Sequence, residues 1–137
     1  MGYLNMIRAK VISEVLGSPQ EHVDKTLNLL IDKLKERKEL NIGNEKIFQA
    51  EKIENKQLFS GFIEYEINVE NLNQLSGFCF DFMPSSIEIL EPDELKTSSV
   101  IIGELFNEIL ARLHQNDMFL RNTIAELAYL KKKSEKK

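Results

Sequence analysis

Hydrophobic and polar residues alternate over two long stretches of the chain, residues 6–16 and 58–69. In the second stretch one face of the predicted strand carries Phe59, Gly61, Ile63, Tyr65, Ile67 and Val69. A period of two is typical of a strand with one buried face. Shorter segments at 45–53 and 86–90 predict two further strands. In the 45–53 strand we expect Phe48 and Ala50 to share a face, opposite Ile47 and Ile53.

Two other segments space their apolar residues as helices do. A helix start is predicted at residues 18–21. Ser18 is placed as the N-cap, Pro19 is at the first helical position and Glu21 can close a capping box. The apolar stripe that follows contains Val23, Leu27, Leu30, Ile31 and Leu34 and reaches to about Lys38. Asn71 is placed to cap a second helix that ends before Pro84. Its stripe contains Leu72, Leu75, Phe78, Cys79 and Phe82.

The order of elements in residues 1–95 is therefore strand, helix, strand, strand, helix, strand. This order is typical of the ferredoxin-like α+β fold, in which two helices cover one face of a four-stranded antiparallel sheet. We predict a ferredoxin-like βαββαβ sandwich in residues 1–95, followed by a long C-terminal α-helix with a basic tail in residues 96–137.

The C-terminal helix is predicted to run from Thr97 or Ser98 to about Lys133, because this stretch has no proline and one glycine. Its apolar residues fit a heptad repeat. One seam position holds Phe106, Leu113, Leu120 and Leu127, and the other holds Ile102, Ile109, Asn116, Thr123 and Leu130. A polar residue such as Asn116 in an apolar seam can fix register and oligomer number. We favour self-association over the alternative, in which Ile102, Phe106 and Ile109 pack on the protein's own sheet and Asn116 marks where the helix leaves it.

Phe80 and Met83 fall off the apolar stripe of the second helix. Large apolar groups outside a core commonly mark an interaction surface. The alternative is that the start of the long helix covers them, since Val100, Ile101 and Leu105 offer a second apolar stripe. Both interpretations stay open at the level of sequence.

Charge is divided unevenly along the 137 residues, whose net charge is −4. Residues 96–137 carry eight Lys/Arg and five Asp/Glu, so their net charge is +3 and that of residues 1–95 is −7. A body this acidic repels nucleic acid. The basic tail, residues 131–137, is the one candidate for binding nucleic acid, and we interpret it instead as a solvated helix end favoured by the helix dipole.

An RNA-binding sheet would need aromatic residues on its open face. Of the aromatic side chains in the strand at 58–69, Phe62 alone is expected there, beside the acidic Glu64 and Glu66. This pattern argues against an RNA-binding sheet.

Targeting features are not evident in the sequence. No apolar run approaches the roughly 20 residues that span a bilayer, and residues 1–8 lack the pattern of a signal peptide. A single cysteine, Cys79, cannot form an internal disulfide, which fits a reducing compartment. We therefore expect a cytoplasmic protein that does not enter a membrane.

Chemistry-bearing residues are few and scattered. His114 and Asp117 share a helix face, and we interpret them as an exposed hydrogen-bonded pair rather than as ligands of a metal ion. Cys79 lies on the apolar stripe of the second helix, so we interpret it as a core residue. The six glycines form no phosphate-binding fingerprint. We expect no metal, no cofactor and no enzymatic activity.

The segment GFCFDFMPSSIEILEP at residues 77–92, together with the opening residues 7–19, resembles small uncharacterised archaeal proteins, a resemblance that implies no particular activity. The order of elements also resembles small-molecule-sensing domains of the ACT type. That resemblance implies a regulatory domain that binds a metabolite at a subunit interface, with Leu16, Gly17 and Ser18 in the binding loop. Fold analogy alone does not carry function.

The favoured interpretation is a non-enzymatic interaction module that forms a homodimer through the long helix, the exposed sheet face, or both. The candidate partner-contact residues are Phe106, Ile109, Leu113, Asn116, Leu120, Leu127, Leu130, Phe80 and Met83. The alternative is the metabolite-binding regulatory domain.

Overall fold

The computed structural model describes residues 6–135. The chain divides into two compact units, Met1–Lys96 and Thr97–Lys137. Each unit is described by itself.

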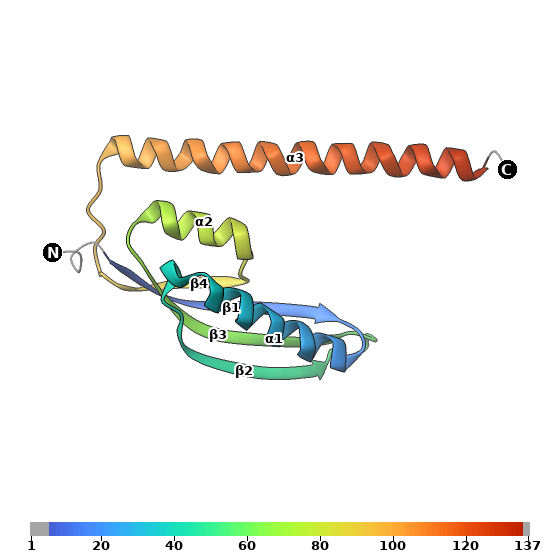
Figure 1. Ribbon diagram of the computed structural model, residues 1–137, viewed down its shortest axis with the longest axis horizontal. Coiled ribbons are helices and arrows are strands. Elements are labelled where there is room, and N and C mark those ends of the chain that lie inside the picture. Colours follow the sequence, from blue (N-terminus) through green and yellow to red (C-terminus); the bar gives the residue numbers. More distant parts are fainter. Residues whose placement is uncertain (1–5, 136–137) are drawn as a thin grey trace. The chain divides into compact units, whose positions relative to one another are not determined.

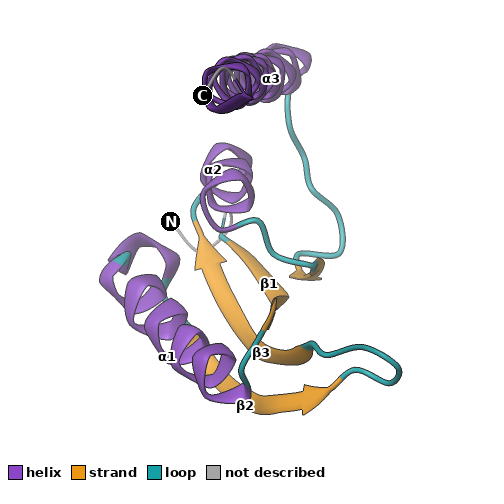
Figure 2. Ribbon diagram, turned by 90° about the vertical axis from the view of Figure 1, so that its right-hand side faces the viewer, coloured by secondary structure: helices purple, strands orange, loops and turns teal. Residues whose placement is uncertain are grey.

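The first unit is a four-stranded antiparallel sheet with two helices on one face (Figures 1 and 2). Its elements are β1 (Ile7–Gly17), α1 (Gln20–Glu36), the short 3₁₀ turn η2 (Lys38–Leu40), β2 (Gly43–Lys52), β3 (Phe59–Val69), α2 (Leu72–Phe82) and β4 (Ser86–Glu91). The strand order is β2-β3-β1-β4, so the two central strands are β1 and β3. The predicted α+β, ferredoxin-like fold is confirmed.

The core lies between the sheet and the helices, and strand alternation decides which residues enter it. Alternate residues of β3 from Gly61 to Val69 are buried, and so are Val23, Leu27 and Leu34 of α1. Tyr65 and Phe78 meet edge to face with ring centroids 6.3 Å apart. Burial raises the pKa of Tyr65 to about 12, so its hydroxyl stays protonated and shares a 2.8 Å hydrogen bond with Ser13 Oγ.

The two helices of this unit start differently. Asn71 caps α2 as predicted, because its side-chain oxygen accepts a 2.8 Å hydrogen bond from the backbone N–H of Gln74. The prediction for α1 was wrong in detail. Its N-cap is Pro19 rather than Ser18, and no side chain caps the helix. The backbone carbonyl of Pro19 instead accepts from the N–H of His22 at 3.0 Å.

Strand β2 contains an irregularity that the sequence pattern conceals. Phe48 pairs with Phe62 and Glu51 pairs with Ser60, so β2 has one extra residue between these two pairs. A bulge of this kind shifts the alternation of a strand. Phe48 therefore faces the open side of the sheet and Ala50 is buried in the core, and the expectation that they share a face was wrong.

Helix α1 forms hydrogen bonds with both the backbone N–H and the backbone carbonyl of Ala50, beside this bulge. The N–H of Ala50 donates to Asp24 Oδ1 at 2.9 Å, and Gln20 Nε2 donates to the carbonyl of Ala50 at 2.8 Å. Gly61 of β3 lies beside the bulge, and a Cβ there would come within 2.6 Å of Leu27 Cδ1 and 3.3 Å of the backbone of Ala50. The small residue at position 61 thus allows α1 and the bulge to approach the sheet closely.

The second unit is a single helix, α3 (Ser99–Glu135), of 37 residues. At about 1.5 Å per residue it is roughly 55 Å long. Ser98 caps it, because its hydroxyl accepts from the N–H of Ile101 at 3.2 Å and its carbonyl accepts from the N–H of Ile102 at 3.1 Å. The predicted long C-terminal helix is confirmed.

Candidate functional site: the apolar seam of the long helix

Helix α3 exposes a continuous series of large apolar side chains. None of its residues is buried within the part of the chain that the structure describes. The exposed fraction ranges from 43% at Ile101 to 74% at Phe119. The exposed large apolar residues are Val100, Ile101, Phe106, Leu110, Leu113, Met118, Phe119, Leu120, Ile124, Leu127, Tyr129 and Leu130.

The predicted seam residues lie along one side of this helix. We call this surface the seam and define it by Ile102, Phe106, Ile109, Leu113, Asn116, Leu120, Thr123, Leu127 and Leu130. Ile102, Ile109 and Thr123 are half-buried, and the other members are exposed. Asn116 therefore interrupts an apolar surface near the middle of α3.

The outer side of α3 is mostly polar, and ion pairs within the helix join it to the positions that flank the seam. Arg121 Nε lies 3.1 Å from Asp117 Oδ2, and Arg112 lies 3.7 Å from Glu108. Both pairs join residues four apart, which stabilises an isolated helix by only a few tenths of a kcal/mol. Lys131, Lys132 and Lys133 lie in the last turns, where the helix dipole favours cations. Lys136 and Lys137 of the predicted basic tail lie outside the described residues.

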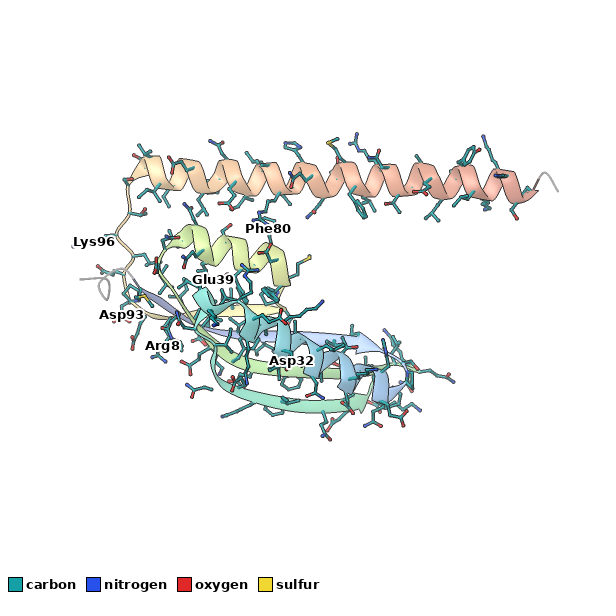
Figure 3. All side chains as sticks on the ribbon, in the orientation of Figure 1. Arg8, Asp32, Glu39, Phe80, Asp93 and Lys96 are labelled. Carbon is teal, nitrogen blue, oxygen red and sulfur yellow. The ribbon has the colours of Figure 1, made fainter. Side chains whose placement is uncertain are left out.

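Phe80 and Met83 differ in their surroundings. Phe80 is half-buried and projects from the side of α2 that faces away from the sheet (Figure 3). Met83 is 77% exposed and ends α2 in the left-handed region, with a φ of 44°. Its backbone N–H donates to the carbonyl of Cys79 at 2.9 Å. Met83 remains a candidate partner contact, and the role of Phe80 stays a prediction.

A second apolar surface in the first unit was not predicted from the sequence. Ile87 and Ile89 of β4 pair with Val11 and Ala9, so they lie on the helix side of the sheet. They are nevertheless 39% and 41% exposed. Helix α2 packs against β3, and β4 is an edge strand. The alternation of residues 86–90 correctly predicted a strand, but not that its apolar side is partly open.

Charged side chains cover much of the open face of the sheet. Arg8, labelled in Figure 3, pairs with both Glu66 and Glu91. Lys10 Nζ lies 2.7 Å from Glu64 Oε1, and Asn44 donates a hydrogen bond to Glu66. These pairs join the central strands to both edge strands.

Phe48 and Phe62 form an aromatic pair on the same open face. Their rings stack with centroids 4.4 Å apart and planes 15° apart. Phe62 was predicted to face this side, whereas no prediction was made for which side Phe48 would face. In the register of β1 and β3, Glu14 lies opposite Phe62. The aromatic surface is therefore bordered by an acidic residue, which does not favour RNA.

The ion pairs on the open face should make stability depend on acid pH. The ammonium of Lys10 lowers the pKa of Glu64 below its ordinary value of 4.5, and hydrogen bonds from Asn44 and Arg8 lower that of Glu66. A carboxylate with a lowered pKa in the folded state stabilises the fold above pH 4.5, and this stabilisation is lost as the pH falls through the folded-state value.

We therefore expect the free energy of unfolding, measured with urea, to fall as the pH is lowered below about 4.5. In Glu64→Gln this pH dependence should be shallower because one linked carboxylate is gone. Lys10→Gln should give a similar flattening, since it removes the cation responsible. An unchanged pH dependence in both variants would show that this pair does not contribute.

The alternative function, metabolite binding, was predicted to use a loop at Leu16, Gly17 and Ser18. These residues lie at the end of β1 and before α1. Leu16 is exposed, with 56% of its surface accessible. A shallow hollow of about 430 Å³ lies elsewhere, on the open face of the sheet. It is lined by Lys10, Asn44, Glu45, Lys46, Glu64, Tyr65 and Glu66. Metabolite binding at the 16–18 loop stays a prediction.

The remaining reactive side chains are dispersed. Among residues 6–135, no three His, Cys, Asp or Glu side chains converge into a group that could hold a metal ion. Cys79 is half-buried against the core, and burial raises the pKa of its thiol, so it is mostly protonated. Asp117, which shares a helix face with His114, forms an ion pair with Arg121. No helix in the described part is long and apolar enough to cross a membrane.

Comparison with known proteins assigns the chain to a family. The model of the MJ0538 family matches residues 8–133. The chain belongs to this family. The match runs from β1 into the last turns of α3, so the sequence shared by MJ0538-family members includes both units.

One curated MJ0538-family relative is "Uncharacterized protein MJ0538" of Methanocaldococcus jannaschii. It is 32% identical over 108 residues, which cover 77% of this chain and 40% of the relative. The chain thus spans less than half the length of that relative. No solved structure matches this MJ0538-family chain. The predicted resemblance to uncharacterised archaeal proteins is confirmed.

Proposed function

We propose that this chain is a non-enzymatic protein-interaction module and that it self-associates through the seam of α3. The observation that carries this proposal is the exposure of large apolar side chains along the whole of α3, a helix without a buried residue among those described. Monomeric soluble proteins rarely expose extended apolar surfaces, and such surfaces commonly mark interaction sites.

The spacing of these residues indicates which kind of partner fits. Apolar side chains at alternating intervals of three and four residues form a narrow stripe that another helix can match by knobs-into-holes packing. The stripe continues from Ile102 to Leu130, about eight turns of helix. A helix of the same length and spacing would bury this surface, and a second copy of the chain supplies one.

Sedimentation equilibrium of the full chain tests the proposal. We expect a species of about twice the monomer mass of 15.9 kDa at micromolar concentrations. Far-ultraviolet circular dichroism at the same concentrations should show the helical content of α3 rising with dimer formation, because helices gain most of their stability from packing. A chain that stays monomeric up to the highest soluble concentration would contradict self-association.

A further inference from the structure

The residues of the seam and beside it also indicate how a partner helix is oriented. This inference rests on the proposed function. We propose that the partner of α3 is a second copy of the chain whose helix lies parallel and in register, forming a two-stranded coiled coil. In heptad notation Phe106, Leu113, Leu120 and Leu127 occupy position a, and Ile102, Ile109, Asn116, Thr123 and Leu130 occupy position d. The flanking positions e and g select the orientation.

Charged residues at the flanking positions match a parallel copy. In a parallel pair in register, the residue at g faces the residue at e five positions later on the other helix. Arg112 at g then faces Asp117 of the second copy, and Glu126 at g faces Lys131 of the second copy. Twofold symmetry repeats each pair, and every one joins opposite charges.

Apolar residues fill the other flanking positions in the same relation. Leu105 at g faces Leu110 of the second copy, and Phe119 at g faces Ile124. These contacts widen the buried strip on either side of the seam. They also account for the exposure of Leu110, Phe119 and Ile124, which lie next to the seam rather than in it.

The antiparallel alternative fits less well. Its seam packs a against d, and the alignment that pairs Phe106 with Leu130 places Asn116 against Leu120 and Asp117 against Asp117. It retains one attraction, between Arg112 and Glu126. A parallel pair instead places Asn116 against Asn116, so the two side-chain amides can satisfy each other, whereas an unpaired buried amide is destabilising.

Asn116 also bears on the number of strands. Isoleucine at d, as at Ile102 and Ile109, favours bundles of more than two helices. A buried asparagine counters this tendency, because it selects a particular register and oligomer state at some cost in stability. Two facing amides hydrogen-bond reciprocally, and the charged flanks cover the sides of a two-stranded seam.

Disulfide trapping tests the orientation in the full chain. In a Cys79→Ser background, Leu130→Cys places one thiol at d near the end of α3. A disulfide needs Cα atoms about 4.4–6.8 Å apart, which facing d positions of a parallel pair provide. We expect Leu130→Cys to form a covalent dimer on mild oxidation, and Ile109→Cys to do the same at a second layer. The matched control Tyr129→Cys, one residue away on the outer side, should remain uncrosslinked.

Charge reversal tests the flanking pairs independently. Glu126→Lys places a lysine against Lys131 of the second copy at two symmetric sites. We expect the dimer dissociation constant to rise about tenfold at low salt. The double variant Glu126→Lys/Lys131→Glu restores opposite charges and should return the constant to near the wild-type value. The effect should shrink as salt is added.

The outcomes separate this inference from the proposed function. A wild-type chain that sediments as a monomer overturns both. A wild-type dimer in which neither Leu130→Cys nor Ile109→Cys crosslinks, or a Glu126→Lys variant that associates as tightly as the wild type, overturns the parallel register alone. A larger oligomer overturns the two-stranded arrangement. Crosslinking at both seam positions, with rescue by the charge swap, supports the inference.

Discussion

Leu120→Glu combined with Leu127→Glu is expected to convert the chain to a monomer. Both leucines lie in the seam of α3, and their substitution would place four carboxylates in the interface of a dimer. Burying unpaired charges is strongly unfavourable. We expect the dissociation constant to rise by at least about a thousandfold, which corresponds to roughly 4 kcal/mol. Sedimentation equilibrium measures this change directly.

A matched control distinguishes loss of packing from added charge. Met118→Glu combined with Ala125→Glu adds the same two carboxylates seven residues apart, on the outer side of α3. This variant should remain dimeric. Leucine, methionine and glutamate have similar helix propensities and alanine exceeds them by only a few tenths of a kcal/mol, so neither double variant should lose the helix for local reasons. If the Leu120 and Leu127 variant stays dimeric, the interface lies in the first unit instead.

Phe78→Ala is expected to produce the largest loss of stability in the first unit. Phe78 is fully buried, and its ring contacts Tyr65 and Phe82 with centroids 6.3 and 5.5 Å away. Truncating a buried phenylalanine leaves a cavity and typically lowers the free energy of unfolding by about 3–5 kcal/mol. This is a large share of the roughly 5–15 kcal/mol that stabilises a small domain. Urea denaturation followed by tyrosine fluorescence measures it.

Phe48→Ala provides the control of the same residue type. Phe48 is 41% exposed and stacks on Phe62 at an edge of the sheet. Its loss removes one cross-strand aromatic pair, worth about 1 kcal/mol or less. Equal destabilisation by the two substitutions would contradict the placement of the core between the sheet and α2.

The fold was predictable where local rules and tertiary packing agree. The alternation of β3 identified its buried face, because both of its neighbours pair with it over most of its length. Asn71 was correctly predicted to cap α2, since its side chain, between β3 and α2, accepts a hydrogen bond from the backbone N–H of Gln74. The absence of proline after Ser98 predicted the length of α3. Each of these features leaves a signal in a short stretch of sequence, which tertiary packing then reinforces.

Other features depend on contacts that a sequence pattern does not contain. Ser18 looked like the better cap, yet the chain leaves β1 so that Pro19 takes that position. Phe48 and Ala50 were expected to share a face because the extra residue between Phe48 and Glu51 is not evident in the hydrophobic pattern. The seam of α3 could be identified from its heptads alone, whereas the open apolar side of β4 could not. That surface results from where α2 packs, which is a tertiary property.

The two hydrogen bonds between α1 and Ala50 have a consequence for how the β2–β3 hairpin forms. Neighbouring strands can pair in alternative registers, and a slip of one residue reverses every side chain. Such a slip would bring Gln49 or Glu51 to the position of Ala50, where a long polar side chain would be buried in the core. Position 50 is where α1 binds β2, since Asp24 accepts from its backbone N–H and Gln20 donates to its carbonyl. We therefore expect the docked helix α1 to favour the observed register, in which the small side chain of Ala50 enters the core.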